Sequence, residues 1–70
     1  MDEQNILAKF GFNFKVERMR LKLSQDKIAD STGFSKTYIS NVEQGKHNIS
    51  LVNALKFATV VNKSIEELLI

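Results

Sequence analysis

Six side chains between residues 36 and 44 have the types and spacing to recognise a partner by hydrogen bonds. They are polar or amphipathic, and only the lysine is charged: Lys36, Thr37, Tyr38, Ser40, Asn41 and Gln44. Ile39 and Val42 lie three residues apart, which predicts the inward face of a short helix. The six would then point outward. Donors and acceptors in this arrangement are suited to base edges and phosphates in the major groove of a duplex.

Two short helices are expected to position this set. The first covers residues 25–32, with Ser24 as N-cap and Gly33 in the left-handed position after its end. The second begins after the N-cap Ser35, ends at Gln44 and is followed by a second terminating glycine. The spacing is that of a helix-turn-helix motif at about residues 24–44, in which Ala29 is small where the helices cross.

The rest of the chain predicts three more helices and a single all-α domain over residues 1–70. A helix over residues 5–22 carries an apolar stripe, with a bend or break expected at Phe10-Gly11-Phe12. A helix from the N-cap Ser50 to residue 61 has one predicted inward face, made of Leu51, Ala54, Leu55, Ala58 and Val61. A short fifth helix is expected at the capping box formed by Ser64 and Glu67.

Composition excludes several classes of function. Without cysteine and with one histidine, the 70 residues offer no disulfide, no metal site and no catalytic cluster, so we expect neither an enzyme nor a cofactor. No apolar run is long enough for a membrane, and the acidic, polar start is unlike a signal peptide, which predicts a cytoplasmic protein. The net charge of +2 is small. Six basic residues nevertheless gather between Lys9 and Lys27, either to attract a polyanion or simply to solvate helix faces.

Residues 24–29 and 33–46 together resemble the Cro/C1-type (XRE-like) helix-turn-helix family. The likeness rests on Gln25, Ala29, Gly33, the Ile-x-x-Val-Glu run from Ile39 and the following Gly-Lys, and it extends over residues 48–51 and 64–69. It implies a five-helix, lambda-repressor-like DNA-binding domain. It also implies a sequence-specific transcriptional regulator, such as a restriction–modification controller protein, a phage repressor or an antitoxin-like autoregulator, in a bacterial or phage-infected cell.

The resemblance also implies residue roles. Gln25, helped by Ser24, would contact a phosphate at a helix N-terminus. Asn41 would pair with adenine, Lys36 with guanine or a phosphate, and the Thr37 methyl with thymine. The complete expected DNA-binding set is Ser24, Gln25, Ser35, Lys36, Thr37, Tyr38, Ser40, Asn41, Lys46 and Asn48.

Other positions are expected to support this set or to depart from the family pattern. The resemblance implies an ion pair between Arg18 and Glu43 that orients the reading helix. Tyr38 has two interpretations, as a DNA contact or as a residue packed at the rim of the core. His47 is expected in an exposed loop, where it could contact the DNA backbone. Lys22 and Asn62 stand where many family members have glycine, and Lys63 stands where many have an apolar residue.

A single module of this size makes few contacts with DNA, so we expect a homodimer on a palindromic operator, with half-sites about 34 Å apart. Four apolar residues left over from the predicted core are the expected interface: Val52, Val60, Leu69 and Ile70. No small-molecule effector and no membrane partner are expected. The alternative function is a protein-interaction or antitoxin-like module that uses the same fold without reading DNA.

Overall fold

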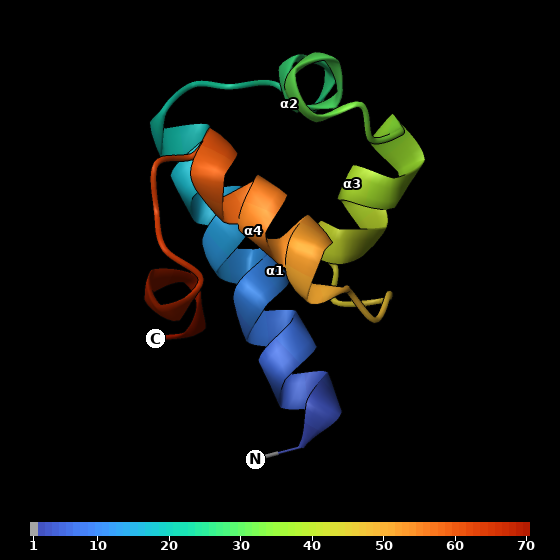
Figure 1. The fold of residues 1–70 in the computed structure, drawn as a ribbon, viewed down its shortest axis with the longest axis vertical. Helices are drawn as coiled ribbons and strands as arrows, with labels where there is room; N and C mark the ends of the chain where they lie inside the picture. Colours follow the sequence, from blue (N-terminus) through green and yellow to red (C-terminus); the bar gives the residue numbers. More distant parts are fainter. Residues whose placement is uncertain (1) are drawn as a thin grey trace.

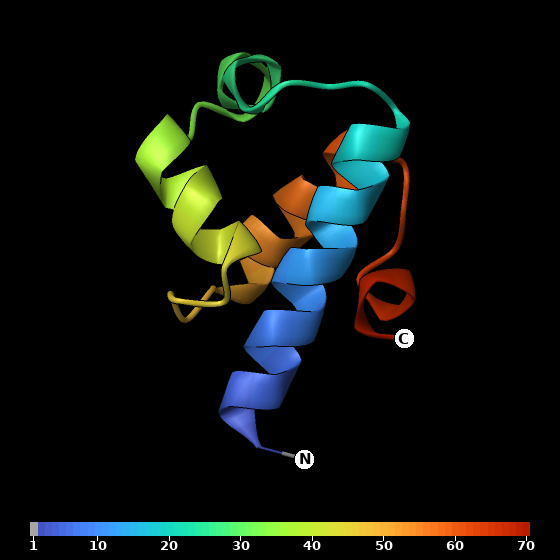
Figure 2. The same ribbon diagram turned by 180° about the vertical axis from the view of Figure 1, so that it is seen from behind.

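The structure is a computed structural model that describes residues 2–70. Within them the elements are α1 (Glu3–Arg20), α2 (Gln25–Thr32), α3 (Lys36–Glu43), α4 (Leu51–Val60) and a 3₁₀ helix (Glu66–Leu69). Helices α1 and α4 cross at the centre, α2 and α3 form one flank, and the 3₁₀ helix lies beside α1 on the other (Figures 1 and 2). The all-α prediction is confirmed. All five predicted segments are present, but the fifth is a 3₁₀ turn, so the described residues form four α-helices and one 3₁₀ turn.

Serine caps set the beginnings of three helices. The hydroxyls of Ser24, Ser35 and Ser50 accept hydrogen bonds from backbone amides three residues on, at 3.0, 3.0 and 3.1 Å. Each bond satisfies an amide that has no partner within its own helix. At the other end of α2, Gly33 has a φ of 82°, in the left-handed region. The caps and the turn between α2 and α3 therefore form as the sequence predicted.

The predicted fifth helix is a single 3₁₀ turn. Its capping box is present: the Glu67 amide donates to the Ser64 hydroxyl, and the Glu67 carboxylate accepts from the Ser64 amide at 2.9 Å. The hydrogen bond that the Ser64 backbone amide donates lowers the pKa of the Glu67 carboxyl, and the positive charge of Lys63 also lowers it. Asn13 of α1 donates to the carbonyls of Leu68 and Ile70. These contacts to α1 hold a tight 3₁₀ turn with Leu68 buried, and one turn is too short to propagate an α-helix.

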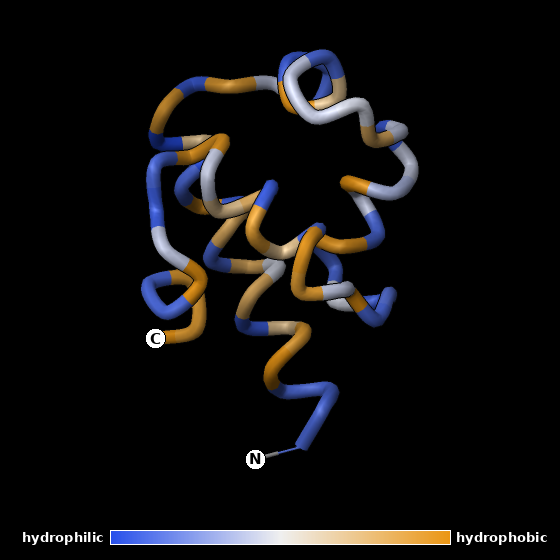
Figure 3. Tube along the Cα trace, viewed as in Figure 1, coloured by the Kyte–Doolittle hydropathy of each residue, from blue (hydrophilic) through white to orange (hydrophobic). Residues whose placement is uncertain are grey.

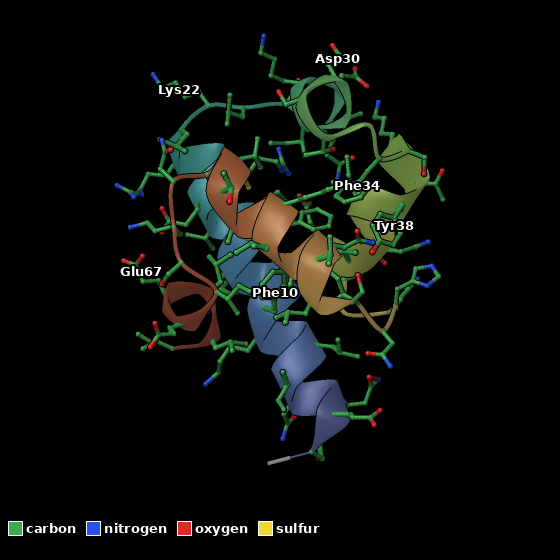
Figure 4. The ribbon with its side chains drawn as sticks, viewed as in Figure 1. Phe10, Lys22, Asp30, Phe34, Tyr38 and Glu67 are labelled. Carbon is green, nitrogen blue, oxygen red and sulfur yellow. The ribbon has the colours of Figure 1, made fainter. Side chains whose placement is uncertain are left out.

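Four aromatic rings form the centre of the core. The rings of Phe14 and Phe57 meet edge to face at 4.8 Å, and Phe34 stacks on Phe57 at 4.9 Å. Phe10 also meets Phe57 edge to face. Figure 4 shows Phe10 and Phe34 lying toward the interior, whereas Lys22 and Asp30 project outward. Because the rings come from α1, the α2–α3 turn and α4, the core fixes α2 and α3 against the rest of the domain.

The predicted inward face of α4 is correct for Ala54, Ala58 and Val61, but the buried face extends toward Phe57 and not toward Leu51 and Leu55. Leu51 and Leu55 are 75% and 55% exposed, whereas Phe57 is fully buried together with Ala54, Ala58 and Val61. Both faces satisfy helical spacing, and the structure buries the one that carries the large aromatic ring. The hydropathy colouring in Figure 3 shows apolar residues along both sides of α4. An apolar face made of Leu51, Val52 and Leu55 is therefore left at the surface, and we call it the α4 face.

Helix α1 runs without a break through Gly11, where the sequence predicted a bend or break. Gly11 is buried, and a Cβ built there would overlap the carbonyl oxygen of Val42 and lie 2.9 Å from that of Glu43. The glycine therefore permits close approach of α1 to the end of α3. Five apolar residues along α1 and at its C-cap are exposed: Ile6, Phe12, Val16, Met19 and Leu21.

Lys22 and Asn62 both adopt left-handed backbone conformations with a φ of 59°. A lysine in the left-handed conformation lowers the stability of the fold by about 1–2 kcal/mol. A glycine removes this cost, but it raises the conformational entropy of the unfolded chain, which lowers stability by about 0.4–1 kcal/mol. We expect Lys22→Gly to raise the free energy of unfolding by about 0.5–1 kcal/mol, measured by urea denaturation. Asn62→Gly should gain less, because asparagine tolerates this region. Equal gains at both positions would contradict this explanation.

Candidate nucleic-acid interface

Of the six side chains predicted to point outward from α3, Lys36, Thr37 and Gln44 are exposed, and Tyr38, Ser40 and Asn41 are half-buried. Ile39 and Val42 are buried at 0% and 2% exposure and hold the helix against the core. Side chains on the opposite side meet the beginning of α2 in one shallow hollow, lined by Gln25, Lys36, Thr37, Ser40 and Asn41. The structure thus brings together five residues of the expected DNA-binding set, from two helices.

The two serine caps lie at the beginnings of α2 and α3. Ser24 and Ser35 each use an oxygen lone pair to accept a backbone amide, which leaves the hydroxyl hydrogen free to donate. The helix N-termini add unpaired amides and a partial positive charge. This combination suits a phosphate group.

A buried glutamate connects three helices behind the hollow. Glu43 accepts from Arg18 of α1, with Nε–Oε2 at 2.7 Å and Nη2–Oε1 at 3.2 Å. It also accepts from Gln25 Nε2 of α2 at 3.0 Å. Arg18 donates in addition to the backbone carbonyl of Leu23, before α2. The pair between Arg18 and Glu43 is thus present, and the contact to Gln25, which spacing alone did not reveal, fixes one end of that amide while its second N–H stays free.

Tyr38 packs at the rim of the core. Its ring lies 5.1 Å from that of Phe34 and 6.0 Å from that of Phe57, and its hydroxyl accepts from Asn53 Nδ2 of α4 at 3.1 Å. Figure 4 shows Phe34 and Tyr38 together beside α4. Of the two interpretations, the geometry favours rim packing. The hydroxyl hydrogen of Tyr38 remains available to a phosphate.

Two residues outside the hollow, Asp26 and His47, contact side chains that line it. Lys36 Nζ lies 3.2 Å from the Asp26 carboxylate, with both side chains well exposed, so the pair is weak and the lysine can move to another anion. Asn41 Nδ2 lies 3.2 Å from His47 Nε2, in the loop between α3 and α4. His47 lies in the loop where the sequence predicts it, but residue spacing did not reveal its contact with α3. Lys46 and Asn48, in the same loop, are exposed.

The residues expected to form a dimer interface do not make one patch. Val60 is half-buried and packs on the core, because it lies between the buried and exposed faces of α4. Val52 is 64% exposed and shares a hollow with Val60 between α2 and α4. Ile70, beside Leu69, lines a separate hollow against α1. Val52 also belongs to the exposed α4 face, whose other two residues, Leu51 and Leu55, were predicted to lie in the core.

Residues 2–70 form neither a metal-binding cluster nor a membrane-spanning helix. No group of three or more histidine, cysteine, aspartate or glutamate side chains there converges to hold a metal ion. None of the helices in that range combines the length and apolar character that a membrane span requires.

Comparison with known proteins yields consistent relatives. The helix-turn-helix family matches residues 14–68 of the chain. A hypothetical transcription factor from Neisseria meningitidis serogroup B is 33% identical over 69 residues, which cover 99% of this chain and 65% of that protein. The chain therefore spans about two thirds of that relative's length.

Two solved controller proteins have a similar structure. The restriction-modification controller protein C.AhdI from Aeromonas hydrophila is 40% identical, with a TM-score of 0.81 over 89% of this chain and 94% of that one. C.Esp1396I, a restriction-modification controller solved as a tetramer in complex with its natural 35 base-pair operator, is 24% identical. Its TM-score is 0.81 over 91% of this chain and 88% of that chain, and at this identity the likeness concerns the fold.

The family match covers most of the chain, and the capped helices, the left-handed glycine turn and the exposed outer face of α3 form the motif that defines that family. The chain belongs to the Cro/C1-type (XRE) helix-turn-helix family of DNA-binding transcription regulators, and restriction-modification controller proteins are among its relatives.

Proposed function

We propose that this protein is a controller-type transcription regulator that binds a palindromic operator as a homodimer, with α3 in the major groove. The hollow that joins the beginning of α2 to the outer face of α3 carries the proposal. It combines phosphate-binding groups with side chains that can read base edges, and it does so on the exposed side of the motif. The relationship to the controller protein C.AhdI at 40% identity supports the same function.

The proposed contacts divide into positioning and reading. Gln25, with Ser24 and the first amides of α2, binds a phosphate on one side of the groove. Ser35 and Ser40 add hydroxyl donors, and Lys46 and Asn48 bind the DNA backbone from the loop after α3. Lys36, Thr37 and Asn41 face the bases. Tyr38, whose ring is packed at the rim, contributes at most its hydroxyl to a phosphate.

Substitutions in the hollow test this proposal. Asn41→Ala should weaken binding to operator DNA by about tenfold to a hundredfold while leaving affinity for scrambled duplex unchanged, because an asparagine–adenine contact carries sequence information. Lys36→Ala should weaken binding to every duplex if the lysine binds a phosphate, and reduce the salt dependence. Fluorescence anisotropy with duplexes selected by the wild-type protein from a random library, at matched salt, measures both effects.

Lys15→Ala is the matched control, since it removes the same charge outside the hollow. Far-ultraviolet circular dichroism confirms that each variant is folded. If the wild-type protein bound selected and scrambled duplexes equally tightly, DNA reading would be rejected and the protein-interaction alternative would take its place.

The proposed dimer forms through the α4 face, with a second copy of this chain as the partner. Leu51, Val52 and Leu55 expose contiguous apolar area on one side of α4, of a kind that commonly marks an interface. Two copies related by a two-fold axis place two α3 helices about 34 Å apart, one turn of the duplex. A cooperative pair of reading helices then supplies the affinity that a single module lacks.

Leu55→Lys tests the dimer directly. It places a charge on the α4 face where the side chain is already 55% exposed, so the fold is retained and self-association is lost. Sedimentation equilibrium should change from a dimer to a monomer. Phe12→Lys, at a 62% exposed apolar site on α1, is the control and should leave the dimer intact. The reverse result would place the interface on α1.

A further inference from the structure

The loop after α3 places the only histidine of the chain against the reading helix. His47 is exposed, its Nε2 lies 3.2 Å from Asn41 Nδ2, and its ring lies 5.9 Å from that of Tyr38. We propose that His47 is a specificity-determining residue: its neutral imidazole holds the Asn41 amide in the orientation that reads adenine. This inference rests on the proposed function, because it presupposes that Asn41 faces a base.

The contact with Asn41 determines which nitrogen of the neutral His47 ring carries the proton. An amide nitrogen only donates, so the contact between Asn41 Nδ2 and His47 Nε2 requires that Nε2 accept and that Nδ1 carry the proton. One of the two Nδ2 hydrogens is then bound to the ring. The other, together with Oδ1, is free to make the bidentate contact with adenine N7 and N6. Rotation of the Asn41 amide by 180° would exchange its nitrogen and its oxygen. Asn41 Oδ1 would then face adenine N7, and no hydrogen bond could form because both atoms are acceptors.

Protonation of the His47 ring would turn Nε2 from an acceptor into a donor. Histidine changes its charge between about pH 5 and pH 8, and an imidazolium offers a donor at both nitrogens. Protonated His47 therefore favours Oδ1 of Asn41 as its partner and turns the amide away from the adenine-reading orientation. The same proton adds a positive charge beside the DNA, which strengthens binding to any sequence. Specificity and non-specific affinity are thus expected to change in opposite directions with pH.

The neighbours of His47 include one other titratable side chain, on α3. Tyr38 of α3 is the titratable group that faces it, and Lys46 precedes it in the chain. None of the ion pairs formed within the described part of the chain, residues 2–70, involves His47.

The experiment begins with duplexes that the wild-type protein selects from a random library at about pH 8. The A·T pair whose replacement no longer matters in Asn41→Ala identifies the base that Asn41 reads. Discrimination at this pair, measured as a ratio of Kd values, should be about tenfold or more at this pH. At about pH 5.5 it should fall at least threefold while affinity for scrambled duplex rises.

Two variants separate the amide's orientation from charge. His47→Glu offers an acceptor at both pH values, so discrimination should persist at both, although overall affinity falls. His47→Arg offers only donors, so discrimination should be low at both, although overall affinity rises. Both variants keep the α-amino group, which titrates in part of the same pH interval, so any pH effect that they share with the wild-type protein does not come from His47.

Unchanged wild-type discrimination between the two pH values, or full discrimination in His47→Arg, would overturn the role of His47 while operator binding, and with it the proposed function, stands. Equal binding of selected and scrambled duplexes at about pH 8 would overturn both.

Discussion

Gly11→Ala is expected to lower the free energy of unfolding by about 3 kcal/mol, at or beyond the upper end of the usual cost of overpacking. The added methyl group would overlap the Val42 carbonyl oxygen and lie within 3.0 Å of the Glu43 carbonyl group. Both obstacles are backbone at the end of α3, so no flexible side chain can move aside. For a chain of 70 residues, whose total stability is about 4–10 kcal/mol, this loss is a large fraction.

Gly33→Ala is the control for this prediction. Gly33 has a φ of 82°, yet nothing lies within 4 Å of a Cβ built there, so the cost is that of backbone strain, about 1–2 kcal/mol. Urea denaturation of both variants measures the difference. Because α1 must move away from α3 in Gly11→Ala, the near-ultraviolet dichroism of the aromatic core should change in that variant. If both variants lost the same free energy of unfolding, α1 could move away from α3 without a large energetic cost, which would contradict this prediction.

The role of Gly11 illustrates what the sequence could not predict. Read along the chain, a glycine inside a helical pattern suggests a weak point. Its actual use depends on the position of Val42, which is 31 residues away (42 − 11) and whose carbonyl approaches from another helix. The orientation of α4 has the same cause. A face that extends to Leu55 and a face that extends to Phe57 both fit helical spacing, and the contact of Phe57 with Phe14 of α1 selects the second.

The parts that were predicted correctly depend on local chemistry. A cap such as Ser24 or Ser35 acts over three residues, so its hydrogen bond follows from the sequence. The inward pair Ile39 and Val42 then determines which side of α3 is exposed. Two cross-helix contacts near the hollow were not predicted from residue spacing, since separate helices bring their side chains together: Gln25–Glu43 and Tyr38–Asn53. The contact between Asn41 and His47 was not predicted because it depends on how the loop after α3 folds back on that helix.

Arg18→Ala is expected to cost about 3–5 kcal/mol, because it leaves a buried carboxylate without its counter-charge. The Glu43 side chain is 4% exposed and would keep only the neutral amide of Gln25 as a partner. The Leu23 carbonyl would also lose the hydrogen bond that it accepts from Arg18. Urea denaturation should show the loss, and Arg18→Lys should recover only part of it, because an ammonium group lacks the planar fork that contacts both carboxylate oxygens.

A double variant separates stability from orientation. Replacing Arg18 and Glu43 together by methionine removes both charges at similar volume, and such exchanges are often neutral or stabilising. The fold should therefore be recovered, but Gln25 would have lost the acceptor that fixes its amide. Affinity for every duplex should then fall a few-fold without a change in sequence preference, because Gln25 is proposed to bind a phosphate. Recovery of both stability and DNA affinity would show that the ion pair holds the helices together without orienting Gln25.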